Sequence, residues 1–580
     1  MSEQAQEISF KSLFVPFTPL KAVHYIILIG VIVYANGLSN TFLGDDFLQI
    51  TNNVSVHSLT NIGSFFFGST FYNGQGRELS GAYFKPFLSA SYAVIYTLFK
   101  DTPFWYHLFQ LILHITNTAF LYLVFRYFLK NSTSFILSLL FLVHPINSQS
   151  VFYIAAFQEP LFFFYGIVAF WLLLKFKCEK YLHLIVILLL FSIFSKETGI
   201  LFFVLCGFYI FLYHKKYFKI YFIYSLLSLA VYFILRFHAV GLAKNPHTTP
   251  IDGLNLFDRL LHVPAILLFY FKTFIFPAKL SWTNNWSIST FNYNTFYLPL
   301  IIILVLLASA IITGILIKKY SADKYFKSYL FFLGTLTIGL LLHIQIIPLD
   351  MITCESWFYF PIVGLLGMIG VTYESLWSKV NKKMILLLAS IVILVLSIRT
   401  IYRSFDWRSE ITMIHKDLDF NMDNYAADEN LALYLYQQDK LDESQKMVEE
   451  SIQRYPRALS YNLLGLIYFE RGDFAKAREA YVKGLKKGGL QLQYESMAQL
   501  GIFYGRPEDN IHFINYGLQK YPNDLFLWQY LAISFYKLNK IDEAKMAIEN
   551  AYKLNPSTQM AITYKTIINK QKLNMIPKNL

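Results

Sequence analysis

Charged residues are scarce in this chain. Asp, Glu, Lys and Arg make up 15% of its 580 residues, whereas they make up about 25% of ordinary soluble domains. Hydrophobic residues make up 55% of the sequence, and the mean hydropathy is +0.42. This composition excludes an ordinary soluble enzyme and favours a protein with much of its surface in lipid.

Three other features are rare or missing. The three cysteines, Cys178, Cys206 and Cys354, lack metal-type spacing, so the sequence predicts neither a disulfide framework nor a metal site. A Gly-rich phosphate loop of the P-loop type is absent. No basic n-region or Ala-x-Ala cleavage signal precedes residue 20, so residues 22–38 are predicted to be a retained helix and not a cleaved signal peptide.

Long apolar runs, by contrast, recur along the first two thirds of the chain. Their lengths of roughly 17 to 25 residues suit helices that cross a bilayer. We therefore expect an all-α, polytopic membrane domain with eleven spans, near residues 22–38, 104–128, 135–145, 157–174, 181–194, 198–213, 220–236, 297–317, 328–347, 361–377 and 384–402.

Lysine and arginine are distributed unevenly among the loops between these spans. The positive-inside rule places the basic loops in the cytoplasm and explains the net charge of +13 without nucleic acid. Residues 83–99 and 257–276 are then predicted to lie at the outer interface, because counting either one as a span would invert the charge bias. The basic clusters lie in alternate loops, near residues 126–130, 175–180, 215–219, 318–327 and 379–383.

The C-terminal part, which this topology places outside, is a repeat. After a linker at residues 404–420, the sequence becomes polar and follows a period of about 33 to 34 residues. We predict a tetratricopeptide-repeat domain over residues 421–580, with four repeats and a closing helix near 557–572; one repeat is degenerate at Gly501 and Asn510. The clearest repeat has the expected residues Trp528, Leu531, Ala532, Phe535, Ala544, Ile548, Ala551 and Pro556.

Two adjacent carboxylates, Asp45 and Asp46, stand near the start of the first outer loop, which spans residues 39–103. One interpretation is a solvated turn that ends the first helix. The other is a general base held at the membrane surface, because a charge at the end of a membrane helix is tolerated only if it faces water or has a role.

The other outer loops contribute further titratable groups. An isolated lysine or arginine at a helix end can simply extend to water, and His144 can cap a helix or pack on an aromatic ring. Glu159 and Glu355 lie beside apolar sequence, where an ionised group is expensive without a function. Because separate loops on one side all contribute, we favour a shared outward site formed by Lys85, His144, Glu159, Lys196, Glu197, Arg236 and Glu355.

A site with both signs of charge suits glycosyl transfer. A carboxylate can deprotonate an alcohol, and cations can neutralise a departing phosphate. A polyprenyl-phosphate sugar suits such a site because its tail stays in the bilayer while its sugar phosphate lies at the interface. Two other classes stay open at this point: a non-catalytic scaffold that recruits partners through its repeats, and a transporter, although the predicted spans carry few charges at mid-depth.

The motifs, taken in order, resemble those of a known family. They are Asp-Asp after the first helix, Tyr-x-Lys-Pro-Phe at residues 83–87, His-Pro-Ile at 144–146, Glu159, Ser-Lys-Glu-x-Gly-Ile at 195–200 and Glu-x-x-x-Tyr-x-Pro at 355–361. Over nearly its whole length the chain is similar to the transmembrane and tetratricopeptide-repeat (TMTC) protein O-mannosyltransferases of the GT-C glycosyltransferase superfamily. One position departs from that family: an arginine usually follows the glutamate of the last motif, and this chain has Ser356 there.

The resemblance implies a GT-C-type domain over residues 1–403 and a polyprenyl-phosphate sugar, commonly mannose, as the donor. Asp45 would act as the base toward a Ser or Thr hydroxyl, with Asp46 beside it, although either of the two could take the proton. Close like charges raise the pKa of one carboxyl, which suits a base. A single displacement would invert the anomeric carbon. The phosphate contact of the missing arginine would come from Lys85, Lys196 or Arg236, or else the donor differs. Glu159 matches a position that binds a divalent metal in some relatives, and we assign no metal to it.

The sequence leaves the sugar, the lipid and the acceptor open. An acceptor protein bound near the repeats is favoured, and the alternative enzyme transfers its sugar to a lipid or to a cell-surface glycan. The Lys-, Ile- and Phe-rich composition and the lack of a retention signal favour a bacterial plasma membrane, with the site and the repeats on the periplasmic side. The endoplasmic reticulum is the alternative compartment.

Overall fold

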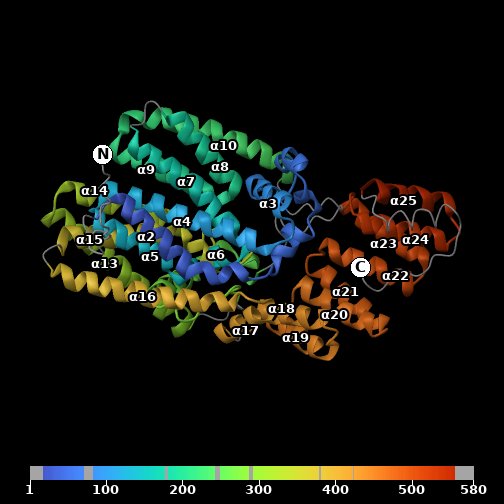
Figure 1. Ribbon diagram of the computed structural model, residues 1–580. Helices are drawn as coiled ribbons and strands as arrows, with labels where there is room; N and C mark the ends of the chain where they lie inside the picture. Colours follow the sequence, from blue (N-terminus) through green and yellow to red (C-terminus); the bar gives the residue numbers. More distant parts are fainter. Residues whose placement is uncertain are drawn as a thin grey trace, which may run out of the picture.

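The computed structural model is all-α and describes residues 17–70, 83–176, 181–241, 249–285, 292–377, 380–421 and 423–554. Within these residues there is no β-strand, and Asn284 and Thr353 form one isolated antiparallel bridge. The chain forms a bundle of long helices, followed by a row of short helix pairs at one end of the bundle (Figure 1).

The bundle helices begin where the sequence supplies a helix start. Proline occupies the first turn of several of them, including Pro19, Pro86, Pro103 and Pro361, where its fixed φ suits the helix and its missing N–H is not needed. The helices are α2 (Pro19–Tyr34), α3 (Pro86–Phe99), α4 (Pro103–Phe128), α5 (Asn131–Val143), α6 (Gln149–Phe152), α7 (Gln158–Lys175), α8 (Leu182–Ser195), α9 (Ile200–Tyr213), α10 (Phe218–Val240), α11 (Leu256–Leu261), α12 (Val263–Ile275), α13 (Leu298–Tyr320), α14 (Asp323–Leu341), α15 (Pro361–Leu376), α16 (Lys382–Asp406) and α17 (Glu410–Phe420).

Seven helical stretches in the described residues are long and apolar enough to cross a membrane. An eighth span is present if α5 and the following helix, bent by 50° at His144, count as one. The helices α8 and α9 have 14 residues each, or about 21 Å at 1.5 Å per residue, which is shorter than a bilayer core of about 30 Å. The seven long apolar stretches indicate an integral membrane protein. The seven are Pro19–Ser39, Pro103–Phe128, Ile154–Lys175, Lys215–Val240, Tyr293–Tyr320, Glu355–Leu376 and Lys382–Asp406.

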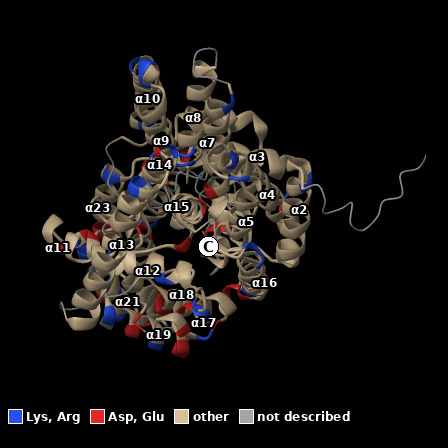
Figure 2. Cartoon of the chain, turned by 90° about the vertical axis from the view of Figure 1, so that its left-hand side faces the viewer, with Lys and Arg blue, Asp and Glu red and all other residues tan. Residues whose placement is uncertain are grey.

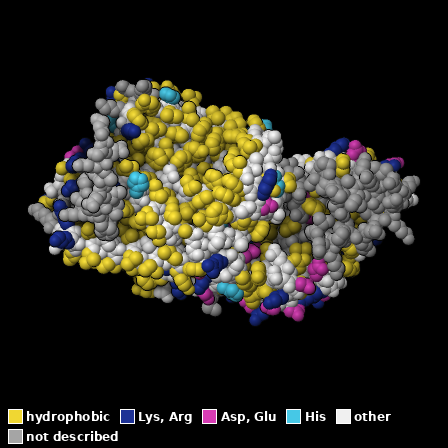
Figure 3. Space-filling view, viewed as in Figure 1, with side chains coloured by type: hydrophobic (Ala, Val, Ile, Leu, Met, Phe, Trp, Pro, Cys, Tyr) yellow, Lys and Arg dark blue, Asp and Glu magenta, His cyan; other side chains and the backbone are white. Residues whose placement is uncertain are grey.

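The outside of the bundle is apolar along its length and charged at its ends. The side in view carries a broad hydrophobic surface over the bundle (Figure 3). Helix α10 exposes apolar side chains such as Leu227 and Ile234. Seen along the bundle, Lys and Arg side chains lie at helix ends nearest the viewer (Figure 2). The last turn of α13 contains Lys318 and Lys319. We call the end nearest the viewer the basic end. The opposite end, which carries the helix pairs, we call the repeat end.

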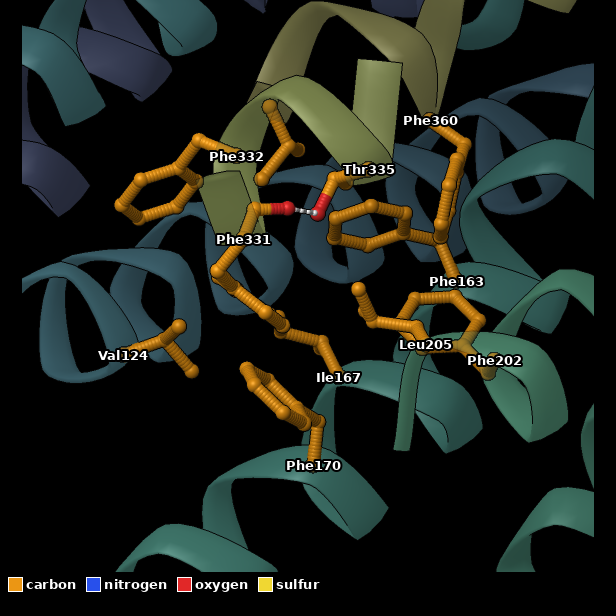
Figure 4. A pocket seen from close by; sticks show the side chains of 11 residues that line it. Val124, Phe163, Ile167, Phe170, Phe202, Leu205, Phe331, Phe332, Thr335 and Phe360 are labelled. Carbon is orange, nitrogen blue, oxygen red and sulfur yellow. Dashed lines mark hydrogen bonds between the residues drawn. The ribbon is translucent and has the colours of Figure 1, made fainter. Parts of the chain in front are cut away.

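The bundle interior is packed mainly with aromatic side chains. Phe128, Phe331 and Phe332 pack together between α4 and α14 with ring centroids 5.0 to 5.3 Å apart; Phe128 stacks on Phe331, and Phe332 meets both rings edge-on. A hollow of about 10 Å³ is left among such rings, between α4, α7, α9, α14 and α15 (Figure 4). Its one polar lining side chain is Thr335, whose hydroxyl donates to the Phe331 carbonyl, 2.9 Å away. A volume near that of one water leaves no room for a substrate there.

The predicted repeats form four antiparallel helix pairs. Small residues let the two helices approach, and the third pair shows how a degenerate repeat keeps its packing: a Cβ on Gly501 would lie 2.2 Å from the Asn510 side chain. Asn510 in turn donates to the Ala498 carbonyl, 3.1 Å away, so its polar group is satisfied. The pairs are α18 (Tyr425–Gln437) with α19 (Leu441–Arg454), α20 (Ala458–Glu470) with α21 (Phe474–Lys486), α22 (Gln491–Phe503) with α23 (Pro507–Lys520), and α24 (Leu525–Lys537) with α25 (Ile541–Leu554).

The segment between bundle and repeats is helical. Residues 404–420, which the sequence predicts as a linker, hold the end of α16 and all of α17, whose Met413, Ile414 and Asp417 are buried. The closing helix predicted near 557–572 lies outside the described residues.

Candidate functional site

The acidic pair lies in a tight turn at the repeat end, just after α2. Gly44 begins this turn with a φ of +47°, which favours glycine. Asp46 is buried and braces the turn: its Oδ2 accepts the Leu43 N–H at 2.9 Å, and its Oδ1 accepts the Ala155 N–H at 2.6 Å. Both carboxylate oxygens of Asp46 therefore accept hydrogen bonds from the backbone.

Asp45 is different from its neighbour. Its side chain reaches solvent, and its own N–H donates to the Tyr153 hydroxyl, 3.1 Å away. The protein around it is nevertheless dense enough that desolvation raises the pKa of this carboxyl, and the charge of Asp350 raises it further. The Tyr153 hydroxyl and Lys85 act in the opposite direction. A raised pKa brings a carboxylate closer to the range in which it is an effective base.

Lys85 is the cation whose charge acts on this carboxylate. It precedes Pro86 at the start of α3 and is buried, and its ammonium lies 4.4 Å from the centre of the Tyr83 ring. Desolvation lowers the pKa of Lys85, and the charges of Glu197 and Asp350 partly offset this. Among the residues that the structure describes, none forms an ion pair with the Lys85 ammonium.

A second lysine lies close by but is paired. Lys196, at the end of α8, forms a buried ion pair with Glu159 at the start of α7. Glu159 also accepts a weak hydrogen bond from the Ser356 hydroxyl at 3.5 Å. Glu197, the next residue along the chain, accepts from the Phe84 N–H at 3.5 Å. The loops predicted to share a site are thus in contact through Lys85, Glu159, Lys196 and Glu197.

Asp350 belongs to this group and His343 lies at its edge, although the sequence did not single out either one as a site residue. Asp350 accepts a hydrogen bond from the Tyr83 hydroxyl and joins the last outer loop to the first. His343 is buried and stacks on Trp357, with centroids 5.0 Å apart, and its Nδ1 has no hydrogen-bond partner in the part of the chain described. Desolvation and the charge of Lys196 lower the pKa of His343. An acidic residue in an outer loop was the signal that could have identified Asp350.

The remaining predicted residues lie apart from this group or at its margin. Both ring nitrogens of His144 are engaged: Nδ1 accepts the Ile146 N–H at 3.2 Å, and Nε2 lies 2.9 Å from the Phe274 carbonyl. Arg236 lies beside Tyr232, and the charge of Glu197 reaches the same tyrosine, so Arg236 is at the margin.

Glu355 faces a different set of residues. It accepts the Ser281 N–H at 2.6 Å and faces Arg403 of α16 at 3.9 Å, and Arg403 also pairs with Asp406 at 3.0 Å. All of these side chains are buried. We call Glu355, Arg403, Asp406 and Asp417 the Arg403 cluster. We call Asp45, Tyr83, Lys85, Glu159, Lys196, Glu197 and Asp350 the Lys85 cluster.

The Lys85 cluster holds two lysines against four carboxylates. A phosphate in it would therefore depend on direct contact with a lysine and not on a general positive field. Within the described residues, no three His, Cys, Asp or Glu side chains are arranged to hold a metal ion. Glu159, which aligns with the metal position of some relatives, is paired with Lys196 in this structure.

Comparisons with known proteins point in one direction. The human protein O-mannosyl-transferase TMTC3 is 24% identical over 506 residues, which cover 80% of this chain and 54% of that protein. The mouse TMTC3 is 25% identical over 70% of this chain and 48% of its own length. The Caenorhabditis elegans protein O-mannosyl-transferase F38B6.6 is 22% identical over 71% of this chain and 59% of its own length. The chain is a distant homologue of the TMTC-type protein O-mannosyltransferases.

The rest of the comparison concerns the repeats and the extent of the match. A model of the tetratricopeptide repeat matches residues 429–488, which confirms the predicted repeats in this part of the chain. The chain spans about half the length of the curated TMTC relatives it matches.

Among solved structures, two matches have low TM-scores. One is YrrB, a tetratricopeptide protein with an unusual peptide-binding site, with 13% identity and a TM-score of 0.24 over 27% of this chain and 82% of that chain. The other is yeast Tom70, with 15% identity and a TM-score of 0.26 over 80% of this chain and 96% of that chain. TM-scores this low establish no shared overall fold.

Proposed function

We propose that this chain is a membrane glycosyltransferase that moves a sugar, mannose in the first instance, from a polyprenyl-phosphate donor to Ser or Thr hydroxyls of proteins. One observation carries the proposal: a solvent-reaching carboxylate of raised pKa, Asp45, and a buried ammonium, Lys85, which has no ion pair with a described residue, lie at one end of an apolar bundle. The distant homology to protein O-mannosyltransferases supports the same reaction class.

The two aspartates then have different roles. Asp45 removes the proton of the acceptor hydroxyl, and the oxygen attacks the anomeric carbon as its bond to the phosphate oxygen breaks. Lys85 and Lys196 neutralise the charge that develops on the departing polyprenyl phosphate. One displacement inverts the anomeric carbon. Asp46 keeps the turn in place and does not take the proton, because both of its oxygens already accept backbone N–H groups.

The topology is part of the proposal. The eleven helices α2, α4, α5, α7, α8, α9, α10, α13, α14, α15 and α16 form a GT-C-type bundle, with the shorter helices crossing together with their neighbours. The basic end faces the cytoplasm, and the repeat end faces outward, in a bacterial plasma membrane. The repeats hold the acceptor protein close to the Lys85 cluster.

The test is direct transfer. Purified protein in lipid nanodiscs is incubated with acceptor protein and a panel of polyprenyl-phosphate sugars that differ in sugar and chain length. We expect the intact mass of the acceptor to rise by one hexose with at least one mannose donor. No transfer from any donor, by protein whose cooperative melting shows that it is folded, would favour the scaffold. Transfer to a lipid or glycan alone would overturn the protein acceptor.

A further inference from the structure

Residues 281–283 connect the beginning of the repeat part to the acidic turn. We call these three residues the strap. On one side Asp417 of α17 holds the strap: its Oδ1 accepts the Trp282 N–H at 2.5 Å, and its Oδ2 accepts the Thr283 N–H and hydroxyl, both at 2.8 Å. Asn424, which caps α18, donates to the Thr283 carbonyl at 2.7 Å. Asp417 and Asn424 therefore both bind the strap.

On its other side the strap touches the turn that carries Asp45. The Trp282 ring lies against Gly44 so closely that a Cβ on this glycine would be 2.8 Å from it. The same ring packs edge-to-face on Tyr153, with centroids 5.6 Å apart. Tyr153 accepts the N–H of Asp45. Trp282 thus contacts the residue before Asp45 and the residue that holds the Asp45 backbone.

The strap has little freedom to move independently. Ser281 donates its N–H to Glu355 at 2.6 Å, and Gln149 donates to the Trp282 carbonyl at 3.4 Å. Just beyond the strap, Asn284 pairs with Thr353 across the isolated bridge and donates to its hydroxyl at 2.9 Å. A displacement of α17 would therefore be transmitted to Trp282 and not absorbed by a loose loop.

We propose that Trp282 is a positioning residue for Asp45 and that Asp417 holds it in place, so that α17 helps to set the geometry of transfer. This inference rests on the proposed function. It follows from the unbroken series of contacts from Asp417 through Trp282 to Gly44 and Tyr153. A base must lie within hydrogen-bond reach of the acceptor hydroxyl, and a misplacement of about 1 Å can lower the rate about 10²-fold.

The first test separates positioning from binding. We expect Trp282→Ala to lower kcat about 10- to 100-fold while KM for the donor changes less than about threefold, because the variant displaces the base and leaves Lys85 untouched. Trp282→Phe, which keeps an aromatic ring against Gly44, is expected to recover most of the rate. Trp377→Ala removes an exposed indole at the basic end and serves as the control. An unchanged kcat in Trp282→Ala would overturn the proposal.

The second test does not depend on activity. Hydrogen–deuterium exchange of the segment around residues 43–47 is compared in the wild type, Trp282→Ala and Asp417→Asn. We expect faster exchange of this segment in both variants, and no change in Asp419→Asn, which alters an exposed carboxylate of the same helix. If the exchange is unchanged, the proposal is wrong. Because this readout needs no donor, it still decides the role of the strap if the proposed transfer activity fails.

Discussion

The Lys85 cluster and the Arg403 cluster lie at the same end of the bundle, and both bury charged groups. They differ in what their charges face. In the Arg403 cluster each carboxylate faces a protein partner: Glu355 and Asp406 face Arg403, and Asp417 accepts three hydrogen bonds from the strap. In the Lys85 cluster, Asp45 reaches solvent and Lys85 has no ion pair with a described residue.

This difference suggests that one cluster stabilises the fold and that the other takes part in the reaction. Charges that pair with one another inside a protein hold segments in register, and removing one partner leaves an uncompensated buried charge. Charges left without a full set of partners are available for a substrate, at a cost in stability. The Arg403 cluster therefore connects α16, α17 and the strap, whereas the Lys85 cluster has charged groups that a substrate can contact.

The largest expected effect is a loss of transfer rate without a loss of stability. Asp45→Asn removes the proposed base and keeps the side-chain shape, so we expect kcat to fall at least about 10²-fold with an unchanged melting temperature. Asp46→Asn is the matched control, because it leaves one buried backbone N–H unpaired and costs about 1–3 kcal/mol of stability. The measurements are transfer rate and thermal unfolding in nanodiscs. The reverse pattern would assign the base to Asp46.

The next effect is a loss of stability when the Arg403 cluster is disrupted. Arg403→Met leaves Glu355 and Asp406 buried without their cation, so we expect a loss of about 3–5 kcal/mol in the free energy of unfolding. A chemical-denaturation curve followed by intrinsic fluorescence measures this loss. A variant with wild-type stability and a selective rise in donor KM would show instead that Arg403 binds substrate.

A smaller effect concerns the buried cation Lys85. Lys85→Met keeps the length of the side chain and removes its charge, so we expect KM for the donor to rise about 10- to 100-fold, as for the loss of a charged hydrogen bond. Stability should change little, because Lys85 has no ion pair to lose among the described residues. Lys279→Met, at an exposed lysine of the same end, controls for net charge. A stability loss without a change in KM would make Lys85 a structural residue.

Much of this architecture could be predicted from the sequence, because it depends on local patterns. Apolar runs located the bundle helices, and a period of about 33 to 34 residues located the repeats. The segment 404–420 was harder, since the burial of α17 depends on distant residues and not on local composition: Met413 packs in a cluster with Trp282 and Trp407, and Ile414 packs with Leu431 and Leu435 of α18. The short α8 and α9 are as apolar as a span, and only the structure gives their length.

The site was less accessible to sequence reasoning. The loops that form the Lys85 cluster could be grouped by topology alone, since they share one side. Asp45 and Asp46 could not be told apart, because the distinction comes from the Ala155 N–H, which is 109 residues away along the chain. Asp350 was missed for a similar reason: its contact with Tyr83 crosses 267 residues.

The smallest expected effect tests whether the charge of Asp350 acts on Asp45 in the Lys85 cluster. Its charge raises the pKa of Asp45, and a base works only when ionised, so transfer should decline as pH falls through that raised value. Asp350→Asn removes the charge but keeps an oxygen for the Tyr83 hydroxyl. The pKa of Asp45 should then fall, and the acid limb of kcat/KM against pH should move to lower pH. Asp419→Asn, remote and exposed, should leave the profile in place. If the acid limb does not move in Asp350→Asn, the charge of Asp350 has no effect on Asp45, and the cluster is limited to Lys85 and its nearest carboxylates. A shift to higher pH would mean that Asp350 acts through its contact with Tyr83 and not through its charge.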